Sequence, residues 1–497
     1  MIPQTQRAVQ LVGPDQLLLN ESKPVPLPGP HQILCKVEVV GLCFSDLKLL
    51  KQFTGHARKS EIVAGLDKSV LAQIPSYVPG DKPTVPGHET VVRIVAVGPK
   101  VKSARLGQRF LVQTDYRWLP TDGSCAAFGY NFEGALQEYV LMDERVITSP
   151  EGESMLIPVP ENIAASAIAL VEPWACVENA YAQVQRRTLK PDGKRLVVRK
   201  PEDISPGQFD DVIYYGSDPS VAEKLFSHLA PNGLLILCQC GGRFGRPVTT
   251  QIGRVHYGNI RIVGTPGDNP QDALAAIPAT AEVRAGDRVN VIGAAGPMGM
   301  MHVIRSLSLG LNGVTVFAGD LNDERLAVLK RLCEPVAKQN NAALRPYNPQ
   351  KETLTEPCTY IVIMAPVPAL VSQAVQQAGT GAIINIFAGI AADKTAAIDL
   401  DAYIAKRMYF IGTSGSVVDD MKAVLAKVVS GRLDTNLSVA AVSGLEGAID
   451  GIRAVEKNLL PGKIMVYPDC KGLKLTPITP PWTKQAEETL LAQYPKS

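Results

Sequence analysis

The sequence predicts an α/β protein in which an all-β first domain precedes a doubly wound parallel sheet, with a partial repeat of that sheet inserted. Short apolar runs separated by Gly and Pro extend from Gln6 to about Leu141, which is typical of strands. From Pro158 onward, apolar residues recur at helical spacing and strands alternate with helices, which favours a parallel sheet covered by helices. Matching residues that lie 148 or 149 positions apart indicate the inserted repeat.

Length, charge and cysteine content exclude several classes of protein. The chain has 497 residues, and single cores stop growing at roughly 250–300 residues, so we expect at least two domains. Because 50 Lys and Arg face 48 Asp and Glu, we expect no nucleic-acid partner. The sequence has no signal-peptide pattern and no apolar run of roughly 18 residues, so we expect a cytoplasmic protein without a membrane partner. Nine Cys without regular spacing indicate a reducing compartment.

The first domain is interrupted by one polar stretch. The runs ILCKVEVVGLC, ETVVRIVAVG, RFLVQTD and ALQEYVLM predict its strands. Between the first two, the stretch from Gln52 to Pro83 is punctuated by Gly and Pro and is interpreted as an inserted loop or lid. His56, Arg58 and Lys59 in this stretch could meet a phosphate or a polyol chain, but we favour a solvated loop.

The second half of the chain alternates strands and helices. RVNVIGAAGPMGMMHVIRSLSLG predicts a strand, a Gly-rich turn and a helix, and YIVIMAP and AIINIFAG predict further strands. We predict a first domain over residues 1–182, with the tail 465–497 packing on it. The inserted repeat would cover 183–278, and the parallel sheet domain 279–464.

The repeat rests on paired positions at nearly constant offset. Pro219 pairs with Pro368 at 149, and four pairs follow at 148: Gly233 with Gly381, Gly241 with Gly389, Gly264 with Gly412, and Asp272 with Asp420. The alternative is coincidence between two ordinary strand–helix–strand stretches. Because the copy lacks a Gly-rich turn, we expect it to be structural or interfacial rather than a second cofactor site.

A dinucleotide site is indicated by the turn that opens the helix after RVNVI. Its predicted contacts are Gly293, Gly296, Pro297, Met298 and Gly299. Glycines there permit a tight turn and close approach of a pyrophosphate to the helix N-terminus. Asp320, at the end of the next strand, can bind the adenosine ribose and repel a 2′-phosphate, which favours NAD over NADP. Alternatively, Asp320 caps the helix near Asn322, and Arg325 either lies near the adenine or is a solvated helix residue.

Four residues are candidate metal ligands. Cys43 lies in GLCFSD, His88 and Glu89 in PGHE, and Glu172 in LVEPW. A thiolate, an imidazole and carboxylates together suit zinc in a catalytic site with an open position. Glu89 is either a direct ligand or a neighbouring carboxylate that exchanges with substrate or water.

The ordered series GLCFSD, PGHE, VxxVG, EP and GxxGxxG resembles the zinc-dependent medium-chain dehydrogenase/reductase family. The resemblance implies a GroES-like β domain followed by a Rossmann domain, here with the inserted partial Rossmann-like repeat. It implies zinc held by Cys43, His88 and Glu172 with Glu89 adjacent, a proton-relay hydroxyl on Ser45, and Asp46 orienting His88. Ser45 and Asp46 also form an ordinary helix start. Only Cys125 lies where the family carries an optional four-Cys zinc loop, so we expect one zinc.

The resemblance is strongest to the polyol and sugar dehydrogenase branch, in which a carboxylate replaces the second cysteine ligand. The segments AGPMG, EPWACVENAY, DDMK and QAEETLLAQ are similar to the L-sorbose-1-phosphate reductase group in particular. Two departures stand out. The interval of 45 residues from Cys43 to His88 is about twice the usual one, and the repeat interrupts the chain between Glu172 and Val289.

These observations predict a function. We expect an NAD-dependent, zinc-containing dehydrogenase acting on a secondary alcohol or ketone of a polyol, sugar or sugar phosphate, assembled as a homodimer or homotetramer. The alternative is a non-catalytic dinucleotide-binding or regulatory protein of the same fold. A zinc-free quinone reductase is disfavoured by the candidate ligands and by Asp320.

Overall fold

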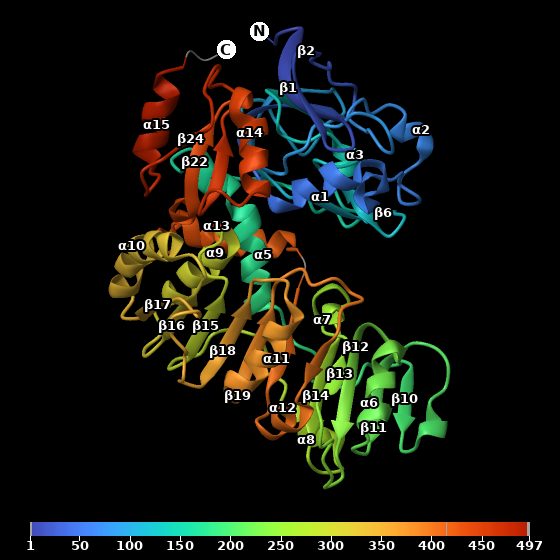
Figure 1. The fold of residues 1–497 in the computed structure, drawn as a ribbon. Helices are drawn as coiled ribbons and strands as arrows, with labels where there is room; N and C mark the ends of the chain where they lie inside the picture. The colour runs from blue at the N-terminus through green and yellow to red at the C-terminus, as the bar shows by residue number, and fades with distance from the viewer. Residues whose placement is uncertain (1, 414, 495–497) are drawn as a thin grey trace. The chain divides into compact units, whose positions relative to one another are not determined.

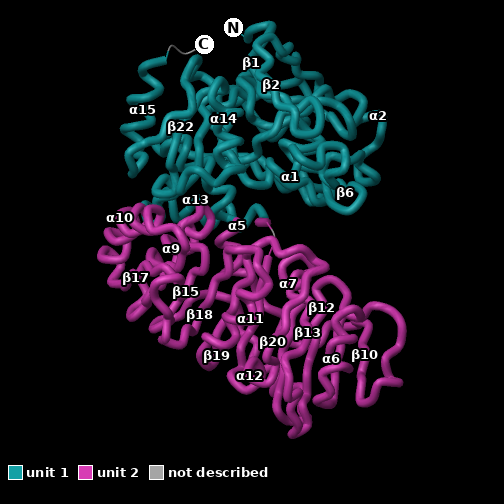
Figure 2. The backbone as a smooth tube through the Cα atoms, in the orientation of Figure 1, with its two compact units in different colours: residues 1–175, 417–497 teal, residues 176–416 magenta. Residues whose placement is uncertain are grey.

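The computed structural model describes residues 2–413 and 415–494 of the chain. It divides into two compact units, one of residues 1–175 and 417–497 and the other of residues 176–416 (Figure 2). Within the described residues, no helix combines the length and the apolar character that crossing a membrane requires. Each unit is described separately below.

The first unit is built on a mixed sheet of short strands. In spatial order these are β24 (Thr476–Pro477), β22 (Val439–Ser443), β23 (Lys463–Val466), β3 (Gln32–Gly41), β4 (Glu89–Val97), β5 (Arg109–Val112) and β9 (Leu156–Pro158), with β8 (Tyr139–Asp143) pairing to β3. Two antiparallel pairs accompany it: β1 (Thr5–Gly13) with β2 (Gln16–Pro24), and β6 (Asp115–Thr121) with β7 (Ser124–Ala127). The predicted all-β character of the N-terminal domain is confirmed.

Short helices connect and cover these strands. They are α1 (Phe44–Gln52), α2 (Lys68–Leu71), α3 (Glu144–Ile147), α4 (Ala165–Ala169), α13 (Val418–Val429), α14 (Leu445–Glu456) and α15 (Lys484–Ala492) (Figure 1). α5 (Val171–Ala182) begins in the first unit and ends in the second.

The stretch from Gln52 to Pro83 is a packed part of the first unit. The stretch contains the 3₁₀ turns Phe53–Gly55 and Ala57–Lys59 and helix α2. Several of its apolar side chains are buried, including Ile74, which follows α2. Lys59 is fully buried, and its Nζ donates to the backbone oxygens of Val78 and Lys82. The solvated-loop interpretation is therefore wrong for Lys59, because backbone carbonyls inside the fold replace water around its ammonium group.

The C-terminal part of the chain belongs to the first unit over a longer range than predicted. The unit boundary lies at 416/417, whereas the sequence placed residues up to 464 with the parallel sheet. The reason is strand pairing: β23 joins β3 antiparallel, and β22 joins β23 in parallel. The pairing of β23 with β3 connects residues more than 400 positions apart, which a local pattern does not reveal.

The second unit contains a six-stranded parallel sheet with the strand order expected for a dinucleotide-binding fold. The order is β17 (Ala343–Tyr347), β16 (Thr315–Gly319), β15 (Arg288–Ile292), β18 (Cys358–Ile363), β19 (Ala378–Ile386) and β21 (Tyr409–Ile411). Its helices are α9 (Pro297–Leu307), α10 (Asp323–Gln339), α11 (Pro368–Gln377) and α12 (Leu400–Ala405). In sequence numbering this is the order 3-2-1-4-5-6 of the Rossmann fold, and the predicted Rossmann sheet is confirmed.

The inserted repeat forms a second, smaller parallel sheet in the same unit. Its strands are β10 (Arg195–Val198), β11 (Phe209–Tyr215), β12 (Leu229–Cys238) and β14 (Arg261–Thr265), with helices α6 (Pro219–Leu225), α7 (Gly253–Tyr257) and α8 (Pro270–Ala275). The repeat and the parent sheet region each contribute one further short strand. These strands, β13 (Val248–Thr250) of the repeat and β20 (Ala396–Ile398) of the parent, pair with each other. The partial Rossmann-like repeat is confirmed as a structural copy.

Strand register refines the alignment of the two copies. Leu234 pairs with Arg261, and Ile383 pairs with Tyr409, so the offset is 149 in β12 but 148 in β14. Asn232 (φ 61°) therefore matches Gly381 (φ 69°), both in the left-handed region, instead of the predicted pair Gly233 with Gly381. The one-residue slip falls in the turn that follows β12.

The side chain of Glu487, near the C-terminus, caps helix α4 of the first unit. Glu487 of α15 is buried, and its two oxygens accept hydrogen bonds from the backbone N–H groups of Ala165 (2.7 Å) and Ser166 (2.9 Å) at the start of α4. The hydroxyl of Tyr467 also donates to it. A helix that begins Ala-Ser-Ala has no strong cap of its own, and Glu487 supplies one from 322 positions away.

Replacing Glu487 by Ala should lower the free energy of unfolding by about 3 kcal/mol, because two buried N–H groups and a phenol lose a charged acceptor. The shift in the urea-denaturation midpoint measures this loss. Glu488→Ala on the same helix is the matched control, since that side chain is exposed and pairs with the exposed Lys484. Equal midpoints for both variants would contradict the capping role.

Candidate active site

The first unit brings Cys43 and His88 together through strand pairing. β3 ends at Gly41, two residues before Cys43, and β4 starts at Glu89, one residue after His88. In the antiparallel ladder Gly41 lies opposite Glu89, so the end of one strand meets the start of the other. The doubled interval between Cys43 and His88 leaves this arrangement intact, because the extra residues fold elsewhere in the unit.

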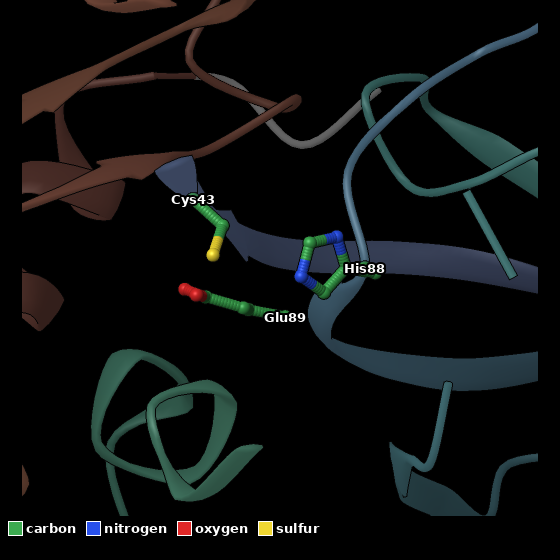
Figure 3. A group of neighbouring side chains, drawn as sticks. All are labelled: Cys43, His88 and Glu89. Carbon is green, nitrogen blue, oxygen red and sulfur yellow. The ribbon is translucent and has the colours of Figure 1, made fainter. Parts of the chain in front are cut away.

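Three potential metal-ligand atoms converge at this point. One ligand atom each from Cys43, His88 and Glu89 lies within 4.8 Å of the other two, and Figure 3 shows the thiol, the imidazole and the carboxylate directed towards a common point. His88 and Glu89 are buried, and Cys43 is half-buried.

Asp46 fixes the orientation of the His88 ring. Its Oδ1 lies 3.1 Å from His88 Nδ1, and its Oδ2 accepts a hydrogen bond from the Cys43 backbone N–H. Burial lowers the pKa of His88, but the charge and hydrogen bond of Asp46 outweigh burial and raise it well above 6.5. With Nδ1–H donated to Asp46, Nε2 is left to face Cys43. Asp46 thus caps α1 and orients His88 at once.

Ser45 lies between the thiol and the imidazole. Its Oγ is 3.2 Å from Cys43 Sγ and 3.3 Å from His88 Nε2. The phenol of Tyr130 hydrogen-bonds to Ser45, and the Tyr130 ring centroid is 5.9 Å from that of His88. Tyr130 is buried, and this burial raises the pKa of its phenol.

The segment 52–83 also reaches this region. The centroid of the His56 ring lies 5.1 Å from that of Tyr130, and the Arg58 guanidinium lies 5.3 Å from the Tyr130 ring. Arg58 is anchored by an ion pair of 2.8 Å with Asp115. These contacts hold Arg58 against the wall of the site, so the solvated-loop interpretation is wrong for Arg58 as well.

Glu89 has a partner that the sequence did not suggest. Lys463, the first residue of β23, places Nζ 2.5 Å from Glu89 Oε1, and the two side chains are 5% and 0% exposed. The other oxygen, Oε2, is buried and has no hydrogen-bond partner. Gly41 makes room for it, since a Cβ there would come within 2.3 Å of Oε2. A lone Lys before a short apolar run gives no signal that it will pair with a carboxylate 374 positions away.

Glu172 lies outside the three-residue group. It is buried in the first turn of α5, and its charge interacts with those of His88, Glu89 and Lys463. Burial, reinforced by the nearby Glu89 and Asp115 charges, raises the pKa of Glu172. The sequence interpretation put Glu172 among the metal ligands. Among the described residues, the ligand atoms that lie within 4.8 Å of one another come from Cys43, His88 and Glu89.

The residues fit a zinc ion. Sulfur, imidazole nitrogen and carboxylate oxygen are the donors that zinc prefers, and three protein ligands are typical of catalytic zinc sites. The unpartnered buried Oε2 of Glu89 is the atom that a cation would satisfy. Ser45 lies next to the thiol and the imidazole, where a further ligand would be substrate or water.

The Gly-rich turn in the second unit has the geometry of a dinucleotide site. Gly293 follows β15 with φ 85°, and α9 begins at Pro297 with Gly296 as its N-cap. A Cβ on Gly299 would come within 2.2 Å of the Gly293 carbonyl oxygen, so helix and turn pack without a side chain between them. Since no side chain caps α9, its first N–H groups can bind an anion. Met298 is half-buried in the first turn.

Asp320 follows β16 beside this turn. Its Oδ2 accepts a hydrogen bond of 3.0 Å from the Ala295 backbone N–H, and its Oδ1 accepts one from Asn322. The cap of α10 is Asn322, which accepts from the Arg325 backbone N–H, so Asp320 is not the helix cap. The Arg325 side chain is half-buried on α10.

The role of Lys463 can be tested by removing its charge. Lys463→Ala should lower the free energy of unfolding of the chelator-treated protein by about 3–5 kcal/mol, because it leaves the Glu89 carboxylate buried and unpaired. Chemical denaturation in the presence of EDTA measures this value without any contribution from metal.

Two variants control for other effects of the substitution. Lys457→Ala, at an exposed position, should cost little, and the double variant Lys463→Ala with Glu89→Ala should recover part of the loss. Additive losses in the double variant would show that the two side chains do not stabilise each other.

Comparison with known proteins agrees with this geometry. Residues 29–151 match the alcohol dehydrogenase GroES-like domain, which includes Cys43 to Glu89. Residues 29–151 are a GroES-like domain. The chain is 25% identical over 249 residues to the uncharacterised protein YggP of Escherichia coli K12, covering 43% of this chain and 58% of that protein. It is also 25% identical over 174 residues to sorbitol dehydrogenase of Halalkalibacterium halodurans, covering 33% and 41% of the two chains.

The complete fold is also found among solved structures. 2R,3R-butanediol dehydrogenase from Bacillus subtilis superposes with a TM-score of 0.58 at 17% identity, covering 93% of this chain and all of that one. The curated relatives are matched over about half of their length or less. The GroES-like match and the superposition agree on a GroES-like domain together with a Rossmann-like parallel sheet.

Proposed function

We propose that the protein is a zinc-containing, NAD-dependent dehydrogenase that interconverts a secondary alcohol and a ketone of a polyol, sugar or sugar phosphate. The observation that carries the proposal is the convergence of Cys43, His88 and Glu89, with one carboxylate oxygen buried and unpartnered. The sorbitol dehydrogenase relative supports a polyol substrate. The described residues form no disulfide, which supports a reducing, cytoplasmic compartment.

Each residue has a proposed role. Cys43, His88 and Glu89 hold the ion, and Glu172 is the proposed fourth ligand because it is buried and interacts electrostatically with His88 and Glu89. Asp46 keeps His88 in the tautomer whose Nε2 binds metal. Lys463 balances the Glu89 charge and directs its free oxygen to the site.

The chain's own groups position the substrate and move its proton. Zinc and NAD, when bound, supply a Lewis acid and a hydride acceptor. The Ser45 hydroxyl, adjacent to Cys43 and His88, relays the proton of the substrate hydroxyl during oxidation: it accepts that proton while it passes its own proton on towards solvent, and the transfer runs in reverse during reduction. Tyr130 holds Ser45 in place through its phenol.

The cofactor is proposed to bind at the Gly-rich turn. The backbone N–H groups of Gly296, Met298 and Gly299 at the start of α9 receive the pyrophosphate. Pro297, which has no N–H, begins the helix, and Gly293 makes the turn tight. Asp320 accepts hydrogen bonds from the adenosine ribose, and its charge disfavours a 2′-phosphate. Arg325 is proposed to lie beside the adenine.

Zinc content provides the direct test. Cys43→Ser should reduce bound zinc from about one ion per chain to near zero, and should lower kcat/KM by at least about 100-fold. Elemental analysis measures the metal. Activity is measured as oxidation of sorbitol and 2,3-butanediol with NAD, and as reduction of the ketone L-sorbose 1-phosphate with NADH.

The matched control is Cys240→Ser, which removes an exposed thiol in the second unit and should leave zinc content and activity unchanged. If wild-type protein expressed with added zinc carries none, and Cys43→Ser matches it on every substrate, the protein is instead a non-catalytic dinucleotide-binding protein of this fold.

Cofactor preference tests Asp320. Asp320→Ala should raise the KM for NAD by about tenfold or more through loss of a charged hydrogen bond, and should improve the relative use of NADP. Asp323→Ala is the control, because Asp323 is exposed and paired with Lys351. Equal losses with NAD and NADP would assign Asp320 to holding the turn at Ala295 instead of binding ribose.

A further inference from the structure

The inserted copy contacts the parent sheet around an approximate two-fold axis. β13 and β20 occupy equivalent places in the two copies, and they pair antiparallel with Thr249 opposite Ala397. These two residues are 148 positions apart, which is the repeat offset in this part of the chain. A strand that pairs with its own counterpart, at equivalent residues, lies on a two-fold axis.

Contacts away from the axis are reciprocal. At an offset of 148, Gly264 corresponds to Gly412 and His256 to Ile404. Gly264 lies against Ile404, where a Cβ would come within 2.5 Å of its side chain. Gly412 lies against His256, where a Cβ would come within 2.8 Å of its Cα. In a two-fold interface, if one residue touches a second, the counterpart of the second touches the counterpart of the first.

The interface covers a sheet edge that would otherwise be apolar and open. β21 is the last strand of the six-stranded sheet, and all three of its residues, Tyr409, Phe410 and Ile411, are buried. β14 of the copy lies beside β21, and one apolar cluster contains buried residues of both copies, including Ile262 and Phe410. An exposed edge of this kind tends to pair with another chain.

The polar contacts at the interface require two unlike sequences. Arg261 and Tyr409 are counterparts, and both hydrogen-bond to Gln185 Oε1, at 3.0 Å and 2.9 Å. The buried Arg261 guanidinium also donates to the Gly412 carbonyl oxygen. Two identical copies would place two Arg or two Tyr here, and Gln185 would not satisfy both sides in the same way.

We propose that residues 190–278 are a built-in partner that occupies the face where a second copy of this chain would otherwise dock. The face formed by β20 and β21 is already covered by β13 and β14 of the same chain. A homodimer or homotetramer of this protein therefore forms through other surfaces. The proposal is independent of the reaction that the protein catalyses.

Engineered cysteines at the axis test the proposal in the full-length chain. Both Thr249 and Ala397 have exposed side chains, and directly opposed residues of an antiparallel pair lie within the Cα separation of a disulfide. All variants carry Cys240→Ser to remove an exposed natural thiol.

Under mild oxidation, Thr249→Cys with Ala397→Cys should form a disulfide within one chain, seen as a linked peptide pair in single-chain species. Ala397→Cys alone should form no more covalent dimer than the Cys240→Ser parent, because Thr249 of the same chain lies opposite. This comparison is made on non-reducing gels, so association through other surfaces does not affect it.

Three results would overturn the proposal. Efficient covalent dimer from Ala397→Cys alone would mean that β20 pairs with β20 of a second chain. Linkage between chains in the double variant would mean that the copy docks on a neighbouring molecule. Failure of the double variant to crosslink, with both thiols reactive towards a small reagent, would mean that the strands are not opposed in solution.

Discussion

The antiparallel pairing of β3 with β4 is the constraint on which the candidate active site depends. It sets Gly41 opposite Glu89, and the residues that flank these two strand ends supply the thiol and the imidazole. A shift of one residue in this register would turn Glu89 to the other face of the sheet. The segment between the two motifs can therefore grow without disturbing the ligands, provided that the register is kept. The doubled spacing in this chain is an example.

Burying several acidic groups at one point has an electrostatic cost that the rest of the fold offsets. Asp46 is neutralised through His88, and Glu89 through Lys463. Lys463 belongs to β23, which reaches the sheet only after the chain has passed through the entire second unit. The C-terminal segment is thus part of the active site as well as part of the sheet. A metal ion would satisfy the remaining Glu89 oxygen, which is buried and has no hydrogen-bond partner among the described residues.

Local pattern predicted those features that depend on nearby residues. The alternation of strands and helices and the Gly-rich turn followed by a helix follow from short-range rules of backbone geometry, and the candidate ligands in PGHE were chosen by donor chemistry. The sequence could not show the pairing of Lys463, the cap supplied by Glu487 or the burial of Lys59, because each depends on residues brought together by the tertiary fold. The boundary near residue 416 was missed for the same reason.

The inserted copy lacks a counterpart of α9, the helix that the Gly-rich turn opens: after β10 the chain makes only the 3₁₀ turn Pro201–Asp203 before β11 begins. Its four strands match β15, β18, β19 and β21 in order, and the counterparts of β16 and β17 are missing. β16 and β17 lie at the end of the parent sheet farthest from β21, whereas the copy docks at β21. The copy therefore retains the strands that build the two-fold contact. It lacks the strand that would carry a counterpart of Asp320. A second dinucleotide site would require the turn, helix and strand that are absent from the copy, whereas the docking contact requires only the strands that it retains.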